Sequence, residues 1–98
     1  MNIVEIFLPL KNGVKAQGTY NALRHQLTEK FGGLTAFNRA PAEGLWANDQ
    51  DVEKDEIVII EVMTDQIDHA WWAGLREEIQ KSLGEKEIVI RCHQSTRL

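Results

Sequence analysis

Residues 56–63 read Glu-Ile-Val-Ile-Ile-Glu-Val-Met and form the most apolar short stretch of the chain. The run is too short to cross a membrane as a helix and is rich in β-branched side chains, so it predicts a strand buried on both faces. Glu61 breaks the run, and a carboxylate within a central strand costs free energy unless it is paired or reaches water. What surrounds Glu61 is therefore the main question for the rest of the sequence.

The composition is that of an ordinary single domain covering residues 1–98, and this length can bury a core without disulfides or metal. A net charge of -4 argues against nonspecific binding to nucleic acid. No stretch approaches the roughly 20 apolar residues of a membrane helix, and the N-terminal residues do not resemble a signal peptide. The single cysteine, Cys92, has no partner for an internal disulfide. We therefore expect a cytoplasmic protein that does not bind membranes.

The hydrophobic periodicity predicts six elements along the chain. They are strands at residues 2–10, 34–39 (resuming at 45–47), 56–63 and 87–94, and helices at about residues 17–31 and 65–83. In the first strand Val4, Ile6 and Leu8 fall on one face. The second helix is expected to be capped by Thr64 or Asp65. The second strand is the weakest of the six, because it is interrupted by a proline that suits an edge position.

The order strand, helix, strand, strand, helix, strand predicts the α+β, ferredoxin-like βαββαβ fold. In this fold the sheet has four antiparallel strands, with the first and third strands in the centre. Both helices cover one face of the sheet. The opposite face is left without a helix to cover it.

That open face is expected to be rich in apolar side chains. They are Ile3, Phe7, Ile57, Ile59, Met63 and Val89. This is more apolar surface than a monomer usually exposes, and a second copy packed face to face would bury it. We therefore expect a homodimer that forms through the open sheet face, giving a dimeric α+β barrel with two-fold symmetry.

Five segments carry a resemblance to known proteins. They are residues 4–10 (Val-Glu-Ile-Phe-Leu-Pro-Leu), 27–33 (Leu-Thr-Glu-Lys-Phe-Gly-Gly), 39–46 (Arg-Ala-Pro-Ala-Glu-Gly-Leu-Trp), 70–72 (Ala-Trp-Trp) and 87–91 (Glu-Ile-Val-Ile-Arg). With these segments, nearly the whole chain resembles the dimeric α+β barrel superfamily. More narrowly, it is similar to a group of small bacterial proteins of uncharacterised function. The superfamily includes cofactor-independent monooxygenases, isomerases, haem-degrading enzymes and ligand-binding modules, so the resemblance implies fold and assembly but not chemistry.

Strand alternation brings four polar residues to the open face, on three neighbouring strands: Glu5, Glu61, Arg91 and His93. Together they can bind an anionic ligand and move a proton, with His93 and Glu61 as the catalytic candidates. The alternative is purely structural. Glu5 and Arg91 then form a cross-strand ion pair, and Glu61 pairs with Arg39 or with a partner subunit. The structural interpretation is favoured, because such pairs fix register and dimer geometry without catalysis.

The segment from Arg39 to Trp46 suits a lid or an interface arm, which makes Arg39 and Trp46 further ligand-binding candidates. The alternative is a β-bulge with Trp46 packed across the hairpin or into the dimer. Cys92 alternates onto the helix-covered face, where we expect an inert buried thiol. The chain has neither a zinc signature nor a glycine-rich phosphate loop, so we expect no metal and no cofactor.

Three functions remain open from the sequence. The first is a homodimer that binds a small, anionic organic molecule between sheet and helices or across the dimer. The second is a cofactor-independent monooxygenase or isomerase of the same fold. The third is a structural interaction module without a ligand. A cavity around Glu61, Arg91 and His93 would favour the first two. A sheet face filled by Phe7, Ile59 and Met63 would favour the third.

Overall fold

The computed structural model describes the backbone of residues 1–9, 13–33, 35–47 and 52–98, and the side chains of residues 1–9, 16–33 and 57–98. It contains β1 (Asn2–Pro9), α1 (Gly13–Phe31), β2 (Thr35–Ala47), β3 (Val52–Thr64), α2 (His69–Leu83) and β4 (Ile90–Gln94). The predicted α+β class and the predicted order of elements are confirmed.

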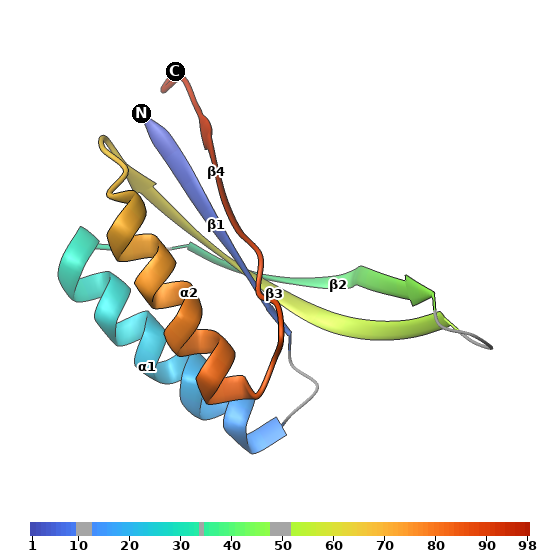
Figure 1. Cartoon of the computed structure of the whole chain (residues 1–98). Coiled ribbons are helices and arrows are strands. Elements are labelled where there is room, and N and C mark those ends of the chain that lie inside the picture. Colours follow the sequence, from blue (N-terminus) through green and yellow to red (C-terminus); the bar gives the residue numbers. More distant parts are fainter. Residues whose placement is uncertain (10–12, 34, 48–51) are drawn as a thin grey trace.

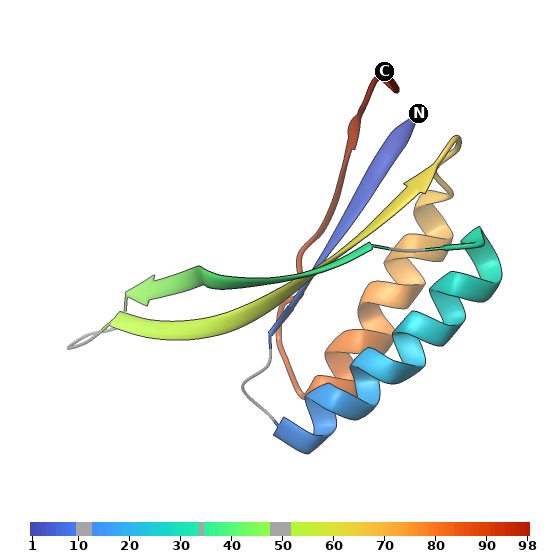
Figure 2. The same cartoon turned by 180° about the vertical axis from the view of Figure 1, so that it is seen from behind.

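The strands pair in the order β2-β3-β1-β4, and each pairing is antiparallel. In the register, Ile6 of β1 lies opposite both Ile60 of β3 and Ile90 of β4. Figure 1 and Figure 2 show both helices on one face of the sheet, while the far end of the β2–β3 hairpin extends beyond them. The other face of the sheet has no helix over it in either view.

The core lies between the helices and the sheet face that they cover. Its strand side chains are Val4, Ile6, Leu8, Val58, Ile60 and Val62, its helix side chains are Ala16, Leu23, Leu27, Trp72, Leu75, Ile79 and Leu83, and Ile88 joins them from just before β4. The side chains in β1 and β3 recur at every second position, and those in α2 recur every three or four. The same two repeats are present in the sequence, so the core faces predicted for β1, β3 and α2 are confirmed.

The start of α2 corrects one expectation. Its N-cap is Asp68, whose side-chain oxygen accepts a hydrogen bond of 3.1 Å from the Trp71 N–H. Thr64 cannot serve as the cap because it is still paired within β3, opposite Asn2. The helix ends at Gly84, which adopts the left-handed conformation (φ 66°) that a side chain would disfavour.

Other boundaries also differ from the expected ones. Helix α1 begins at Gly13, four residues earlier than expected, and β4 begins at Ile90, three residues later than expected. Strand β2 is continuous across the proline, but its register with β3 shifts between Arg39 and Glu43. Over that interval β2 advances four residues while β3 advances one, which is how an edge strand accommodates extra residues. Leu10, the expected end of the first strand, and Leu34, the expected start of the second, lie outside the described residues.

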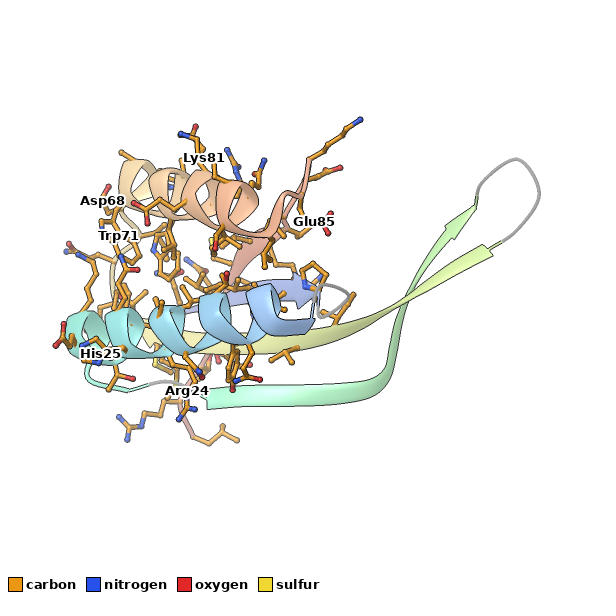
Figure 3. All side chains as sticks on the ribbon, turned by 90° about the horizontal axis from the view of Figure 1, so that it is seen from below. Arg24, His25, Asp68, Trp71, Lys81 and Glu85 are labelled. Atoms are coloured by element: carbon orange, nitrogen blue, oxygen red, sulfur yellow. The ribbon has the colours of Figure 1, made fainter. Side chains whose placement is uncertain are left out.

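The outer surface of the helix layer is polar. Figure 3 shows Arg24 of α1 and Lys81 of α2 on opposite outer sides of the helix pair. Phe31 of α1 and Trp71 of α2 meet edge to face at the seam between the helices, with ring centroids 5.6 Å apart. Within the described part of the chain, neither helix has the length and apolar character needed to span a lipid bilayer.

Candidate functional site

A row of polar residues crosses the open face of the sheet. The register places Glu61 of β3 opposite Glu5 of β1, and Glu5 opposite Arg91 of β4. On the far side of β3, Thr35 of β2 lies opposite Glu61. Residues paired in this way share a face, so the sequence correctly predicted that Glu5, Glu61 and Arg91 lie together.

Glu5 is the buried member of this row, with 7% of its surface exposed. The Arg91 Nε–H donates a hydrogen bond of 2.9 Å to Glu5 Oε1, and His93 Nε2 lies 3.6 Å from the same oxygen. The second distance is too long for a hydrogen bond, so His93 adds an electrostatic contact when it is protonated. The Arg91 guanidinium also lies over the Phe7 ring, 4.8 Å from its centroid, and so helps to cover the apolar part of this face.

Glu61 differs from Glu5 because no described side chain pairs with it. Its direct neighbour across the strands is a second carboxylate, and like charges in opposed positions destabilise a sheet. The register puts Arg39 opposite Ile57 rather than opposite Glu61. The side chains of Arg39 and Trp46 lie outside the described residues, so their part in a site stays a prediction.

The apolar side chains around this row are unevenly covered. Met63 and Val89 are 58% and 47% exposed, whereas Ile3, Phe7 and Ile57 are half-buried. Ile59 lies opposite Phe7 in the register but is only 3% exposed. The expectation that all six apolar side chains are uncovered is therefore wrong for Ile59.

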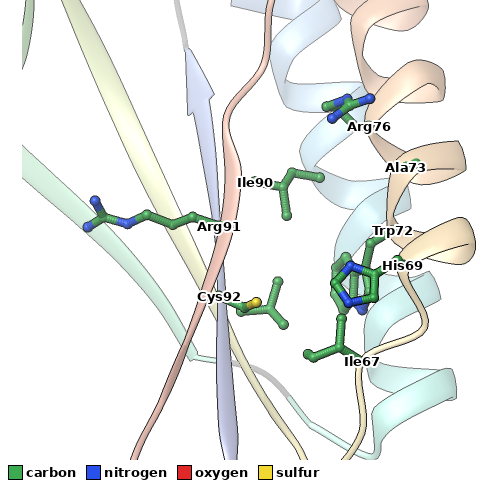
Figure 4. Close-up of a pocket in the computed structure, with 9 residues that line it drawn as sticks. Ile67, His69, Trp72, Ala73, Arg76, Ile90, Arg91 and Cys92 are labelled. Atoms are coloured by element: carbon green, nitrogen blue, oxygen red, sulfur yellow. The ribbon is translucent and has the colours of Figure 1, made fainter.

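Cavities lined by described residues lie elsewhere in the molecule, at two places. One, of about 310 Å³, lies between α2 and β4, and the other, of about 260 Å³, lies beside Phe31 and Trp71. Neither is lined by Glu5, Glu61 or His93. Figure 4 shows the Arg91 side chain pointing away from the larger cavity, on the other side of β4. Of the predicted site residues with described side chains, Arg91 is among the residues that line the larger cavity, whereas Glu5, Glu61 and His93 line neither.

The larger cavity contains polar side chains that sequence reasoning did not select. His69 and Arg76 of α2 line it, together with Cys92 of β4. Cys92 of the edge strand β4 faces α2 as predicted, but it is exposed rather than buried. A signal for this cavity was present in the sequence, because His69, Ala73 and Arg76 share one face of a helix by their spacing.

Metal-binding chemistry has no candidate centre in the part of the chain with described side chains. No three histidine, cysteine or acidic side chains there lie close enough to hold an ion.

Comparison with known proteins supports the fold. No protein-family profile and no curated protein sequence matches the chain. Among solved structures, the chain is similar to a point mutant of CutA1 from Pyrococcus horikoshii OT3, with a TM-score of 0.57, 16% identity, and coverage of 100% of this chain and 86% of that one. It is also similar to the periplasmic divalent cation tolerance protein CutA from Archaeoglobus fulgidus (TM-score 0.58, 14% identity, coverage 98% and 84%). A phage SAM lyase in its apo state is a third neighbour (TM-score 0.60, 10% identity, coverage 94% and 78%).

At these identities the likeness extends to the fold and no further. The CutA1 neighbours have the ferredoxin-like arrangement, so the predicted ferredoxin-like α+β fold is confirmed at that level. The neighbours carry different names and chemistries, which agrees with the expectation that this fold does not determine a function.

Proposed function

We propose that the protein is a cytoplasmic self-associating module whose open sheet face packs against the same face of a second copy, giving the dimeric α+β barrel. The observation that carries the proposal is the apolar surface of this face, where Met63 and Val89 are exposed and no helix lies over the sheet. Stable interfaces between identical subunits bury such surfaces, and they are more apolar than the rest of the protein.

The charges on this face favour a copy of the same chain as the partner. Across a two-fold axis, a residue i that contacts residue j of the second copy is matched by residue j contacting residue i of that copy, so unlike residues can pair twice. Glu61 has no described pairing side chain, and the Arg91 side chain is 62% exposed with only its Nε engaged by Glu5. In the proposed dimer the free guanidinium nitrogens of Arg91 bind Glu61 of the second copy, so that one cation bridges the two carboxylates and each has a charged partner.

Replacing Met63 with lysine tests this interface. We expect the wild-type protein to sediment as a dimer at micromolar concentration and Met63→Lys to weaken the dimer on the order of thirtyfold, because an unpaired ammonium group would be buried. Sedimentation velocity over a dilution series measures both states. The matched control is Leu98→Lys, which makes the same change at a fully exposed position and should leave the dimer intact. A wild-type protein that is monomeric throughout the series would contradict the proposal.

Binding of a small anionic organic molecule is the second candidate function. The observation in its favour is the same exposed Arg91 guanidinium, which two sheets packed face to face would enclose in a space lined by Phe7 and His93. A cofactor-independent monooxygenase or isomerase would need a cavity around His93 and Glu61. Neither cavity described above provides one, so binding is the better supported of the two.

Thermal-shift screening against small mono- and dicarboxylates tests this second function. A ligand at 100 times its dissociation constant adds about 2.7 kcal/mol to the free energy of unfolding, which gives a clear rise in melting temperature. We expect Arg91→Gln to abolish that rise and Arg97→Gln, at the exposed C-terminus, to preserve it. If both variants retain the rise, the anion binds elsewhere and this site is discarded.

A further inference from the structure

The cavity between α2 and β4 is a groove with mostly apolar walls, to which α2 adds the side chains of His69 and Arg76. Its apolar lining residues are Val4, Ile67, Trp72, Ala73, Ile90 and Cys92. Figure 4 shows Ile90 and Cys92 pointing from β4 toward α2, whereas the Arg91 side chain points to the opposite side of the strand. The groove therefore lies on the other side of the sheet from the Glu5–Arg91 pair, and its function is independent of the proposed dimer face.

The polar groups of the groove come from one face of α2. His69, Ala73 and Arg76 are spaced at four and three residues, so they lie in a line along the helix. At a rise of 1.5 Å per residue, the ends of that line are roughly 10 Å apart. The small side chain of Ala73 leaves space between the two longer ones. No acidic side chain lines the groove although the chain has a net charge of -4, so the groove is suited to a negatively charged occupant.

The strand beside the groove is at the edge of the sheet, because β4 is the terminal strand among those that the structure describes. Two main-chain hydrogen bonds mark the ends of its pairing with β1. The Phe7 N–H donates to the Val89 carbonyl (3.0 Å), and the Ser95 N–H donates to the Met1 carbonyl (2.8 Å). The two residues that make these bonds to the β1 side, Val89 and Ser95, are both odd-numbered.

Antiparallel pairing alternates between residues that exchange main-chain hydrogen bonds with the neighbouring strand and residues that do not. The even-numbered residues Ile90 and Cys92 thus turn their N–H and C=O groups away from β1, toward the free edge. These are the same two residues whose side chains line the groove. A free row of main-chain donors and acceptors beside a groove is the arrangement that binds a peptide by strand addition.

We propose that this groove binds an extended acidic peptide segment of a partner protein, which adds to β4 as a further strand. The peptide main chain bonds to Ile90 and Cys92. Its side chains alternate between the two sides of the new strand, so every second one faces α2. An apolar side chain then fits over Ala73, and carboxylates on either side of it reach Arg76 and His69.

A blocked pentapeptide tests the proposal, with valine at its centre, threonine at the second and fourth positions and glutamate at both ends. We expect it to bind and to shift the backbone amide signals of Ile90 and Cys92 in ¹H–¹⁵N correlation spectra. Arg76→Glu should weaken binding at least about tenfold, because a charge-assisted contact becomes repulsive. The matched control Arg97→Glu makes the same charge change at the exposed C-terminus and should bind as the wild type does.

Two modified peptides separate strand addition from simple attraction of charge. N-methylation of one alternate set of amides should weaken binding at least about tenfold, whereas methylation of the other set should be tolerated. A peptide with lysine at both ends should not bind.

Equal binding of both methylated peptides, or binding of the lysine peptide, would overturn the proposal. So would displacement of the peptide by free glutarate at equal concentration, which would assign the groove to small anions. Amide shifts of Ile90 and Cys92 that depend on protein concentration without peptide would assign it to a second copy.

Discussion

Replacing Trp72 with alanine is expected to lower the free energy of unfolding by about 3–5 kcal/mol. Trp72 is 7% exposed, and it holds the two helices together through aromatic contacts. Its ring stacks on Phe31 of α1 with centroids 5.4 Å apart and an interplanar angle of 13°. It also meets Trp71 edge to face at 4.8 Å. Alanine would remove all of these contacts and leave a space that the helix backbones cannot close.

Urea denaturation followed by circular dichroism measures this loss without depending on tryptophan fluorescence. Trp72→Phe is the matched control, because it keeps an aromatic ring against Phe31 and should cost less than half as much. Lys30→Ala provides a second comparison. The Lys30 ammonium lies 4.6 Å from the Trp71 ring centroid but is exposed, so its removal should cost under about 1 kcal/mol. A loss below about 1 kcal/mol for Trp72→Ala would mean that this aromatic cluster is not part of the core.

The fold was predictable to the extent that it depends on local periodicity. The alternation of Val4, Ile6 and Leu8 set the core face of β1, and this assignment needs only the two-residue repeat of a strand. The helical spacing of Trp72 and Leu75 did the same for α2. Once six elements and their faces are known, few compact arrangements remain that bury every apolar face.

Features that depend on neighbouring elements were harder to predict. Thr64 and Asp65 are both good capping residues, and Thr64 is excluded only because the β1–β3 ladder extends to it. Cys92 was assigned to the correct side of the sheet but to the wrong degree of burial. Alternation gives the direction of a side chain, whereas its exposure depends on which other elements cover it, and Cys92 lies on the edge strand β4.

The candidate site also has features that local periodicity predicts and features that depend on neighbouring elements. The Glu5–Arg91 ion pair follows from strand order and alternation, so it could be anticipated and is present. For the groove beside β4, the sequence supplied only the shared helix face of its polar residues. The groove itself depends on the distance between α2 and the edge strand, and its free main-chain groups follow from the register. Sequence reasoning selected neither His69 nor Arg76 as a site residue. The register was needed to bring both residues beside free backbone groups.

Replacing Ile60 with alanine is expected to cost about 2–5 kcal/mol of unfolding free energy, whatever the assembly state. Ile60 is fully buried in the central strand β3 and faces the helices. Met63 lies in the same strand but faces the open side and is 58% exposed. In a dilute, dissociated sample Met63→Ala should therefore cost less than about 0.5 kcal/mol. Urea denaturation of both variants, at a protein concentration below the dimer dissociation constant, measures the contrast.

The same two variants at high protein concentration connect stability to assembly. Dimerisation stabilises the folded chain by mass action, so a residue of the interface affects stability only where dimers form. Met63→Ala should become more destabilising as concentration rises, whereas the cost of Ile60→Ala should stay constant because the core lies within one subunit. A Met63→Ala cost that is large already at the lowest concentration would mean that a single chain covers its own open face. The exposed apolar side chains would then no longer require a second copy.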